Sequence, residues 1–503
     1  MRSRLRCRGW WFVLIAGWLI GPARAEDGTG SRAPDQEQVA RLQAVLAEQA
    51  ERIEQLQEQL VSAQTREQDA ARVEALKQQI REVLSEREFR ESLLPATLQA
   101  GYDGGFFIRS SDDKFLLKIN GRMQFRWTHY AVQSRNRYLN PRLERDDRTG
   151  FTLQRIRLVF SGHAYDPDLT YYLQLDSDAP GGYDTMVRDA YVNYRFADEF
   201  QFQAGYFKTA ALQQELTSSG DLQFVDRSLV HAVFNLDRNM GVRFWGQLLD
   251  KRLEYFLDVT NSFRGGFNRV ITPDPAELDS NPGIAFRTVW HALGEKTGKD
   301  LRVESDIDRL ESPALDLAFH YAFNDDQGDA RTMSLPFPIP RPLPGQGAFG
   351  LTTSNGMQIN QFGLASAFKW QGFSARGEYI LRLLDPRRAD QRPFTPWYLL
   401  TRQGDTTVMH GAYLQVGYFL PIPGLEKKIE AVARVGGIST QANDVEAAWE
   451  YAAGLNYFVH KDKVKLQTDF ARIDEVPISS PSHSLANVND QPLIFRVQLQ
   501  VKF

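Results

Sequence analysis

Cysteine is almost absent from this chain of 503 residues, because Cys7 is the only one. Since Cys7 lies in a leader that we expect to be removed, disulfides and cysteine-bound metals are excluded from the mature protein. The 8 histidines are scattered without metal-ligand spacing, and neither a Gly-x-Ser-x-Gly elbow nor a glycine-rich phosphate loop occurs. We therefore predict no catalytic residues, no metal site, no cofactor and no enzyme.

Long apolar runs are also missing after the first 25 residues, so no later segment resembles a membrane-spanning helix. The leader itself has arginines at positions 2, 4, 6 and 8, an apolar core over Trp10–Ile20, and the small-x-small sequence Ala23–Ala25. This pattern predicts a signal peptide over residues 1–25. The alternative of a membrane anchor is weaker, because the apolar core has about half of the ~20 residues that a span needs.

Residues 36–92 contain neither glycine nor proline and are rich in Gln, Glu, Arg, Ala and Leu. Apolar residues recur there at spacings of three and four, although the phase slips between Leu60 and Val73. This pattern predicts a coiled coil, with a solvated single helix as the alternative. We assign residues 26–100 to a periplasmic coiled-coil segment with its linker.

The formal charge of −4 becomes −9 once the five arginines of the leader are removed. An acidic total argues against nucleic acid as a partner. Two classes of exported protein remain open at this point. One is a soluble periplasmic protein, and the other is a transmembrane β-barrel, whose alternating strands escape detection by averaged hydropathy.

The segment Leu116–Tyr130 favours the barrel, because its residues alternate between apolar and polar types. Alternation of this kind recurs to the end of the chain and predicts about sixteen antiparallel strands, an even number as in single-chain barrels. The expected strands are 115–129, 151–163, 169–177, 187–197, 200–208, 240–249, 252–260, 283–291, 314–323, 359–370, 373–382, 410–420, 428–437, 448–458, 463–472 and 492–503.

Short and long connections alternate between these strands, as expected for a barrel with short periplasmic turns and long outer loops. The long ones are 130–150, 209–239, 261–282, 324–358, 383–409 and 473–491. The connection 292–313 breaks the rhythm, because it should be a short turn and is long. Either a strand boundary is misplaced there or this turn carries an insertion.

Strand periodicity also places basic residues on the inner face of the barrel, since a charge on the lipid face costs ~2–4 kcal/mol near the membrane midplane. Lys118, Arg122 and Arg126 share the inner face of the first strand, where no acid lies among them. Arginine and lysine rows select for anions. Inner acids such as Asp258 and Glu378 offer the alternative that the charges are paired and solvated.

The connection 209–239 is unusually apolar for a loop, with residues such as Leu222, Phe224 and Phe234. Packing of the loop against the inside of the wall would explain them, and so would burial under a partner subunit. The chain ends on an apolar face that closes with Phe503. This ending resembles the signal that outer-membrane barrels present to their assembly machinery.

Several segments resemble the phosphate-selective porin O and P family. They are "GGFFIRSSDDKFLLKINGRMQF" (104–125), "QRIRLVFSG" (154–162), "VRDAYVNYRF" (187–196), "GYFKTAALQQELTSSGDLQFVDRSLV" (205–230) and "RNMGVRFWG" (238–246). The resemblance is strongest over residues 101–250 and does not include the helical region. It implies a trimeric, sixteen-stranded barrel whose pore carries an arginine ladder and a lysine cluster for phosphate or other anions.

The resemblance extends to individual residues. Arg122, Arg126, Arg155 and Arg157 match the early basic strands, and the third-loop motif supplies two more basic positions, Lys208 and Arg227. With Lys118 and Arg243, which alternation places inside, these form the candidate anion pathway: Lys118, Arg122, Arg126, Arg155, Arg157, Lys208, Arg227 and Arg243.

We thus expect an all-β transmembrane barrel over residues 101–503, preceded by the helical coiled coil. The expected function is a water-filled outer-membrane channel for small anions, surrounded by lipid and assembled as a homotrimer. The alternatives are a general porin or an envelope tether, in which the coiled coil contacts the cell wall and the barrel is mainly an anchor.

Overall fold

The computed structural model describes residues 98–134, 147–177, 185–261, 263, 281–296, 298–326, 334–335, 351–352, 357–386, 406–441, 447–474 and 490–503, with five residues between 48 and 55. The chain divides into two units, Met1–Pro95 and Ala96–Phe503. In the first unit the five described residues are helical and exposed. The expected signal peptide, and most of the expected coiled coil over 36–92, lie outside the described residues.

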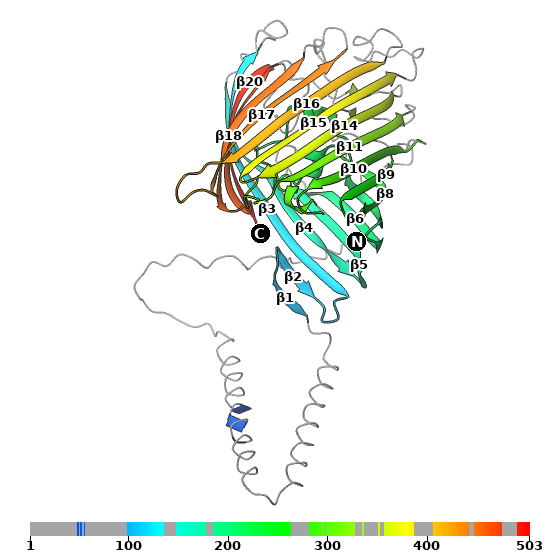
Figure 1. The fold of residues 1–503 in the computed structure, drawn as a ribbon, viewed down its shortest axis with the longest axis vertical. Coiled ribbons are helices and arrows are strands. Elements are labelled where there is room, and N and C mark those ends of the chain that lie inside the picture. The colour runs from blue at the N-terminus through cyan, green and yellow to red at the C-terminus, as the bar shows by residue number, and fades with distance from the viewer. Residues whose placement is uncertain are drawn as a thin grey trace, which may run out of the picture. The chain divides into compact units, whose positions relative to one another are not determined.

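Within the described part of the second unit, sixteen antiparallel strands form a closed barrel (Figure 1). Each expected strand overlaps one of them, so the predicted fold class is confirmed. The strands are β3 (Phe115–Ser134), β4 (Arg148–Ala164), β5 (Asp166–Ser177), β6 (Thr185–Ala197), β7 (Phe200–Lys208), β8 (Arg238–Leu248), β9 (Leu253–Thr260), β10 (Gly283–Leu293), β11 (Ala314–Asp326), β14 (Met357–Trp370), β15 (Phe373–Pro386), β16 (Thr407–Phe419), β17 (Ile429–Thr440), β18 (Ala448–His460), β19 (Val464–Asp474) and β20 (Asp490–Lys502).

The barrel closes where the last strand pairs with the first. β20 lies antiparallel to β3 from Asp490, opposite Ser134, to Lys502, opposite Arg122. Beyond that pair, the backbone of Phe503 exchanges hydrogen bonds with Gly121 at 2.8 and 3.0 Å. A Cβ atom on Gly121 would lie 2.1 Å from the Phe503 ring, so only glycine leaves room for this aromatic residue. Closure leaves no free edge among the sixteen strands.

Burial follows the expected alternation between the two faces of the wall. On β3, Met123 and Phe125 are 47% and 44% exposed, whereas Gln124 and Arg126 are 0% and 2% exposed. A β-bulge interrupts the pattern on β4, because Gln124 pairs with Arg155 and Phe125 with Leu153. The extra residue is Gln154, so Gln154 and Arg155 are both buried and the alternation resumes with Leu153 opposite Phe125.

A short hairpin extends the sheet at the start of β3. Its strands are β1 (Gln99–Tyr102) and β2 (Phe106–Arg109), and β2 pairs with β3 from Leu116 to Ile119. Lys118 therefore lies beside this hairpin, outside the part of β3 that pairs with β20. A separate pair of short strands, β12 (Ser334–Leu335) and β13 (Leu351–Thr352), lies within the connection between β11 and β14.

The irregular connection between β10 and β11 is an insertion in a turn, since both strand boundaries lie close to those expected. It contains the 3₁₀-helix η2 (Lys299–Leu301). Its apolar residues pack on the wall in two small clusters. In one, Leu301 lies against Ala314 and Ala367, and in the other Ile307 contacts Phe419 and Phe458. The insertion therefore covers part of the inner wall at the end of the barrel where the turns lie.

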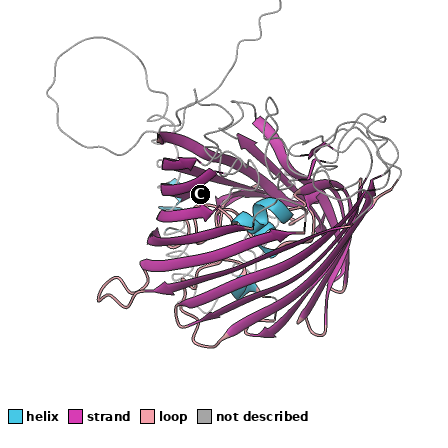
Figure 2. Ribbon diagram, turned by 90° about the horizontal axis from the view of Figure 1, so that it is seen from above, coloured by secondary structure: helices cyan, strands magenta, loops and turns pink. Residues whose placement is uncertain are grey.

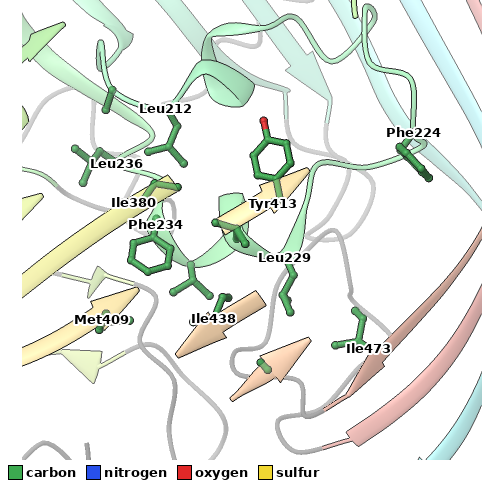
Figure 3. Packing of buried hydrophobic residues seen from close by; sticks show 14 of the residues in the cluster. Leu212, Phe224, Leu229, Phe234, Leu236, Ile380, Met409, Tyr413, Ile438 and Ile473 are labelled. Atoms are coloured by element: carbon green, nitrogen blue, oxygen red, sulfur yellow. The ribbon is translucent and has the colours of Figure 1, made fainter. Parts of the chain in front are cut away.

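The connection between β7 and β8 folds into the barrel, and its helices α3 (Gln213–Leu216) and α4 (Leu229–Phe234) lie inside the ring of strands (Figure 2). We call residues 209–237 the inner loop. Its apolar side chains form the main core cluster with inward-facing wall residues, as Figure 3 shows for Phe234 beside Met409 and Ile438. The reading of this loop as packed on the wall is confirmed. Among the described residues, no helix has the length and apolar character needed to cross a membrane.

Candidate functional site

Polar contacts anchor the inner loop to the wall on the side of β10–β20. The Glu378 carboxylate accepts hydrogen bonds from the backbone N–H groups of Gln213 (2.5 Å) and Gln214 (3.1 Å). The Glu450 carboxylate accepts one from Leu229 N–H at 2.8 Å. Arg382 donates to two carbonyl groups at the end of α4. These buried contacts fix the loop backbone, because breaking one would leave a polar group unpaired inside the barrel.

Asp226, on the inner loop, gathers three arginines of the wall. Its carboxylate accepts from Arg126 at 2.8 and 3.0 Å and from Arg496 at 2.9 Å, and Arg155 lies 3.5 Å away. Burial tends to raise the pKa of Asp226, but the neighbouring arginines outweigh it and hold the pKa well below the usual range. Asp226 is therefore ionised at neutral pH and neutralises part of the basic face.

Arg122 and Arg157 form a second basic cluster beside the first. They are directly opposite each other on β3 and β4. Both guanidinium groups donate to the same hydroxyl oxygen, Ser219 Oγ, at 2.9 Å, and Arg122 also donates to Ser218 Oγ at 3.1 Å. Arg157 is paired with Asp176 at 2.8 Å. The inner loop thus presents neutral hydroxyl groups, rather than a carboxylate, to Arg122.

The turn insertion meets the inner loop within the barrel. Glu304 N–H donates to Asp221 O at 3.0 Å, and the Glu304 carboxylate accepts from Gln223 N–H at 2.8 Å. The same carboxylate accepts from Gln415 of β16 at 2.8 Å. Glu304 is 1% exposed. Segments that start from opposite ends of the barrel therefore hold each other in place.

Not all of the eight predicted pathway residues come together. Arg122, Arg126, Arg155 and Arg157 cluster where the inner loop meets β3 and β4. Lys118 is set apart and pairs with Asp103 of the hairpin at 3.2 Å. The remaining three bind backbone carbonyl groups or a neighbouring carboxylate. They are Lys208, Arg227 and Arg243.

The contacts of these three residues stabilise the wall and the inner loop. Lys208 donates to Glu215 O at 2.6 Å. Arg227 donates to the carbonyl groups of Gln214 and Thr217 within its own loop. Arg243 is 9% exposed and binds both carboxylate oxygens of Asp258. Among the described residues, only Arg122 and Lys208 of the eight have no carboxylate within ion-pair distance.

Sequence reasoning missed the acceptors that face the cations. Asp226 follows an apolar stretch of a long loop, and no periodic pattern predicts where such a side chain points. Ser218 and Ser219 lie in the quoted family motif, but the motif alone does not distinguish them as partners of arginine. Glu304 lies in the irregular connection, whose length was the one available signal that it has a role of its own.

A closed antiparallel barrel with an apolar outer face, a charged inner face and a loop folded into its interior is the fold of an outer-membrane porin. This architecture points to a channel rather than to an enzyme. Among the described residues, no group of three or more histidine or acidic side chains could hold a metal ion.

The family model described as phosphate-selective porin O and P matches residues 110–263. The resemblance to this family, inferred from the motifs in that region, is thereby confirmed, and family and barrel together point to the outer membrane. No curated protein sequence matches the chain significantly.

Solved structures with a similar fold include the anion-selective porin from Comamonas acidovorans, which is 9% identical in sequence. The match covers 77% of this chain and 99% of that chain, with a TM-score of 0.49. The outer membrane channel DcaP of Acinetobacter baumannii has 9% identity, 80% and 100% coverage, and a TM-score of 0.47. OmpT of Vibrio cholerae has 10% identity, 81% and 100% coverage, and a TM-score of 0.46.

Proposed function

We propose that this protein is a passive diffusion channel for small anions, including phosphate-like oxyanions, in the outer membrane. The observation that carries the proposal is the basic cluster of Arg122, Arg155 and Arg157 beside the inner loop. Guanidinium groups bind oxyanions in a planar, bidentate manner and stay charged at every working pH. No covalent chemistry is needed.

The surroundings of Arg122 explain why this cluster would favour anions over cations. Its guanidinium has only serine hydroxyls and a nearby arginine as close partners among the described residues, and its Nε atom has no hydrogen-bond partner there. An anion that replaced the serine contacts would be bound by a guanidinium that makes no ion pair among the described residues, although Asp221 and Asp176 lie close enough to act on its charge. Asp176 is paired with Arg157 and Asp221 with Lys502, so a cation at the same place would meet Arg122 without a carboxylate in direct contact with it.

The test is the reversal potential of the purified protein in a planar bilayer under a tenfold KCl gradient. We expect a potential that favours chloride. The double variant Arg122→Gln/Arg157→Gln should lose most of this preference, whereas Arg195→Gln at the exposed rim should keep it. A wild-type channel that prefers potassium would refute the proposal.

A general porin and an envelope tether are the competing functions. Deletion of residues 36–92 tests the tether. If this segment links the membrane to the cell wall, the deletion should weaken the envelope and leave anion flux through the barrel unchanged. We also propose a homotrimer, outer-membrane lipid around the barrel, recognition of Phe503 by the assembly machinery, and contact of the N-terminal segment with the cell wall. The separation of the oligomer on native gels tests the first of these.

A further inference from the structure

A set of aromatic residues lies on the inner face of the wall. Strands β5–β9 contribute two stacked pairs there. The rings of Tyr172 and Tyr191 lie 5.2 Å apart with an interplanar angle of 13°. The rings of Trp245 and Phe256 lie 5.9 Å apart at 10°. Inner faces of barrels are polar in general, so four rings there need a reason of their own.

Register shows that these rings point inward. Tyr172 shares its face of β5 with buried Gln174 and pairs across to Tyr191. Trp245 shares its face of β8 with Arg243, whose partner Asp258 is 0% exposed. All four residues are nevertheless partly exposed. A side chain that is turned into the barrel and still exposed borders interior space that the described parts of the inner loop leave uncovered.

Amide groups lie beside the two stacked pairs. Asn193 accepts a hydrogen bond from Trp245 Nε1 at 2.8 Å and donates to Gln201 at 3.2 Å. Gln203 and Gln174 are 6% and 7% exposed, and the Nε2 atom of each has no hydrogen-bond partner among the described residues. Two buried donors without acceptors are costly unless a solute or solvent supplies an oxygen atom.

Positive charge lies next to the aromatic surface. Arg157 pairs in register with Asp176, which is four residues along β5 from Tyr172. At ~3.4 Å per residue this spacing is about 14 Å. Arg188 lies in the bulge of β6 three residues before Tyr191, and its Nε atom also lacks a partner among the described residues. Flat rings, free N–H donors and guanidinium groups thus follow one another along one wall.

From this juxtaposition we propose that the wall formed by Tyr172, Tyr191, Asn193, Gln203, Trp245 and Phe256 is a binding surface for aromatic carboxylates on their way through the channel. The ring of the solute stacks on the tyrosines or on Trp245 and its carboxylate accepts from the glutamine amides, while the positive charges of Arg157 and Arg188 attract the anion to this wall. The proposal rests on the proposed anion channel and names a class of solute within it. Simple inorganic anions would use only the arginines.

The test compares benzoate with acetate, which carries the same charged group without a ring. Each is added to the full-length protein in a planar bilayer, and block of the chloride current is measured as a function of concentration. We expect benzoate to block at concentrations at least tenfold lower than acetate. Removing one stacking surface should weaken benzoate block roughly threefold to tenfold, the range expected for one aromatic contact.

The matched variants are Trp245→Leu on the inner face and Phe244→Leu, its neighbour on the outer face. Tyr191→Ala and Tyr194→Ala form a second pair on β6. We expect the inner variants to weaken benzoate block, and the outer variants to leave it unchanged. Acetate block and chloride selectivity should stay the same in all four.

Equal block by benzoate and acetate in the wild type would overturn the aromatic surface. Equal weakening by the inner and outer variants would overturn it too. A channel that is selective for chloride but indifferent to the ring would leave the proposed function intact, whereas a channel without chloride selectivity would defeat the proposed function instead. Benzamide serves as a neutral solute with the same aromatic ring, and block by benzamide as strong as that by benzoate would overturn the role of the carboxylate.

Discussion

Asp226 limits the positive field of the channel, and Asp226→Asn should therefore raise anion selectivity. The carboxylate is shared by Arg126, Arg155 and Arg496, and Arg496 is also paired with Asp469. These five side chains carry a net charge of +1, which becomes +2 when Asp226 is neutralised. Asparagine has nearly the same volume and keeps an oxygen that can accept from Arg126, so the inner loop can retain its path.

The size of the effect follows from Coulomb's law. A unit charge about 10 Å from a permeating ion changes its energy by roughly 0.4 kcal/mol at a water-like dielectric constant near 80. An anion gains what a cation loses, so the two differ by roughly 0.8 kcal/mol more than before. This corresponds to about a fourfold rise in the ratio of anion to cation permeability. A lower effective dielectric constant inside the barrel would enlarge the change.

The assay is the reversal potential of the variant under a KCl gradient, measured together with single-channel conductance. Conductance is needed because loss of a buried ion pair costs about 3–5 kcal/mol and could release the loop. Asp198→Asn is the control, since Asp198 is exposed in the turn between β6 and β7 and pairs with Lys251. An unchanged reversal potential at unchanged conductance, or a shift toward cations, would refute the reasoning.

The remaining predictions concern single positions. Arg122→Gln should lower the anion-to-cation permeability ratio about fourfold by the same Coulomb estimate, while Arg122→Lys should retain it, as reversal potentials will tell. Glu304→Ala should loosen the inner loop, with a cost of about 1–3 kcal/mol for each unpaired buried group, and raise conductance and current noise, whereas Glu304→Gln should not. Because the pKa of Asp226 is depressed, its ion pairs contribute stability above the ordinary pKa near 3.9 and lose it only as pH falls lower, so thermal unfolding monitored between about pH 5 and about pH 8 should show no transition from this group. Deletion of Phe503 should reduce the amount of folded protein in membranes, measured by heat-modifiable gel mobility, and Phe503→Trp should preserve it.

The barrel was predictable from sequence because its strands obey a local rule. Lipid on one side and polar groups on the other force a two-residue period, and that period locates each strand without knowledge of its partners. Alternation also placed Arg122 and Arg126 on the inner face correctly, as their burial shows. The connection between β10 and β11 was recognised as irregular by its length alone.

The pairing of the charges could not be read from the sequence, because it depends on contacts between distant segments. β3 has no acid of its own on its inner face, yet Arg126 is neutralised by Asp226, 100 positions further along. Alternation likewise gives no reason for apolar inner residues such as Ile380 and Ile438, which are explained only by the inner loop that packs on them. Local periodicity determines the wall, whereas long-range contacts determine which charges on it remain unpaired.

The most direct test of the account is to measure which face of β3 is accessible to water. The only cysteine, Cys7, lies in the expected leader, so single-cysteine variants of the mature chain can be labelled cleanly. A charged, membrane-impermeant thiol reagent is applied to intact outer-membrane vesicles that carry Arg122→Cys or Met123→Cys. The account predicts modification at position 122, with a change in conductance, and protection at position 123. Modification at 123 with protection at 122 would contradict it.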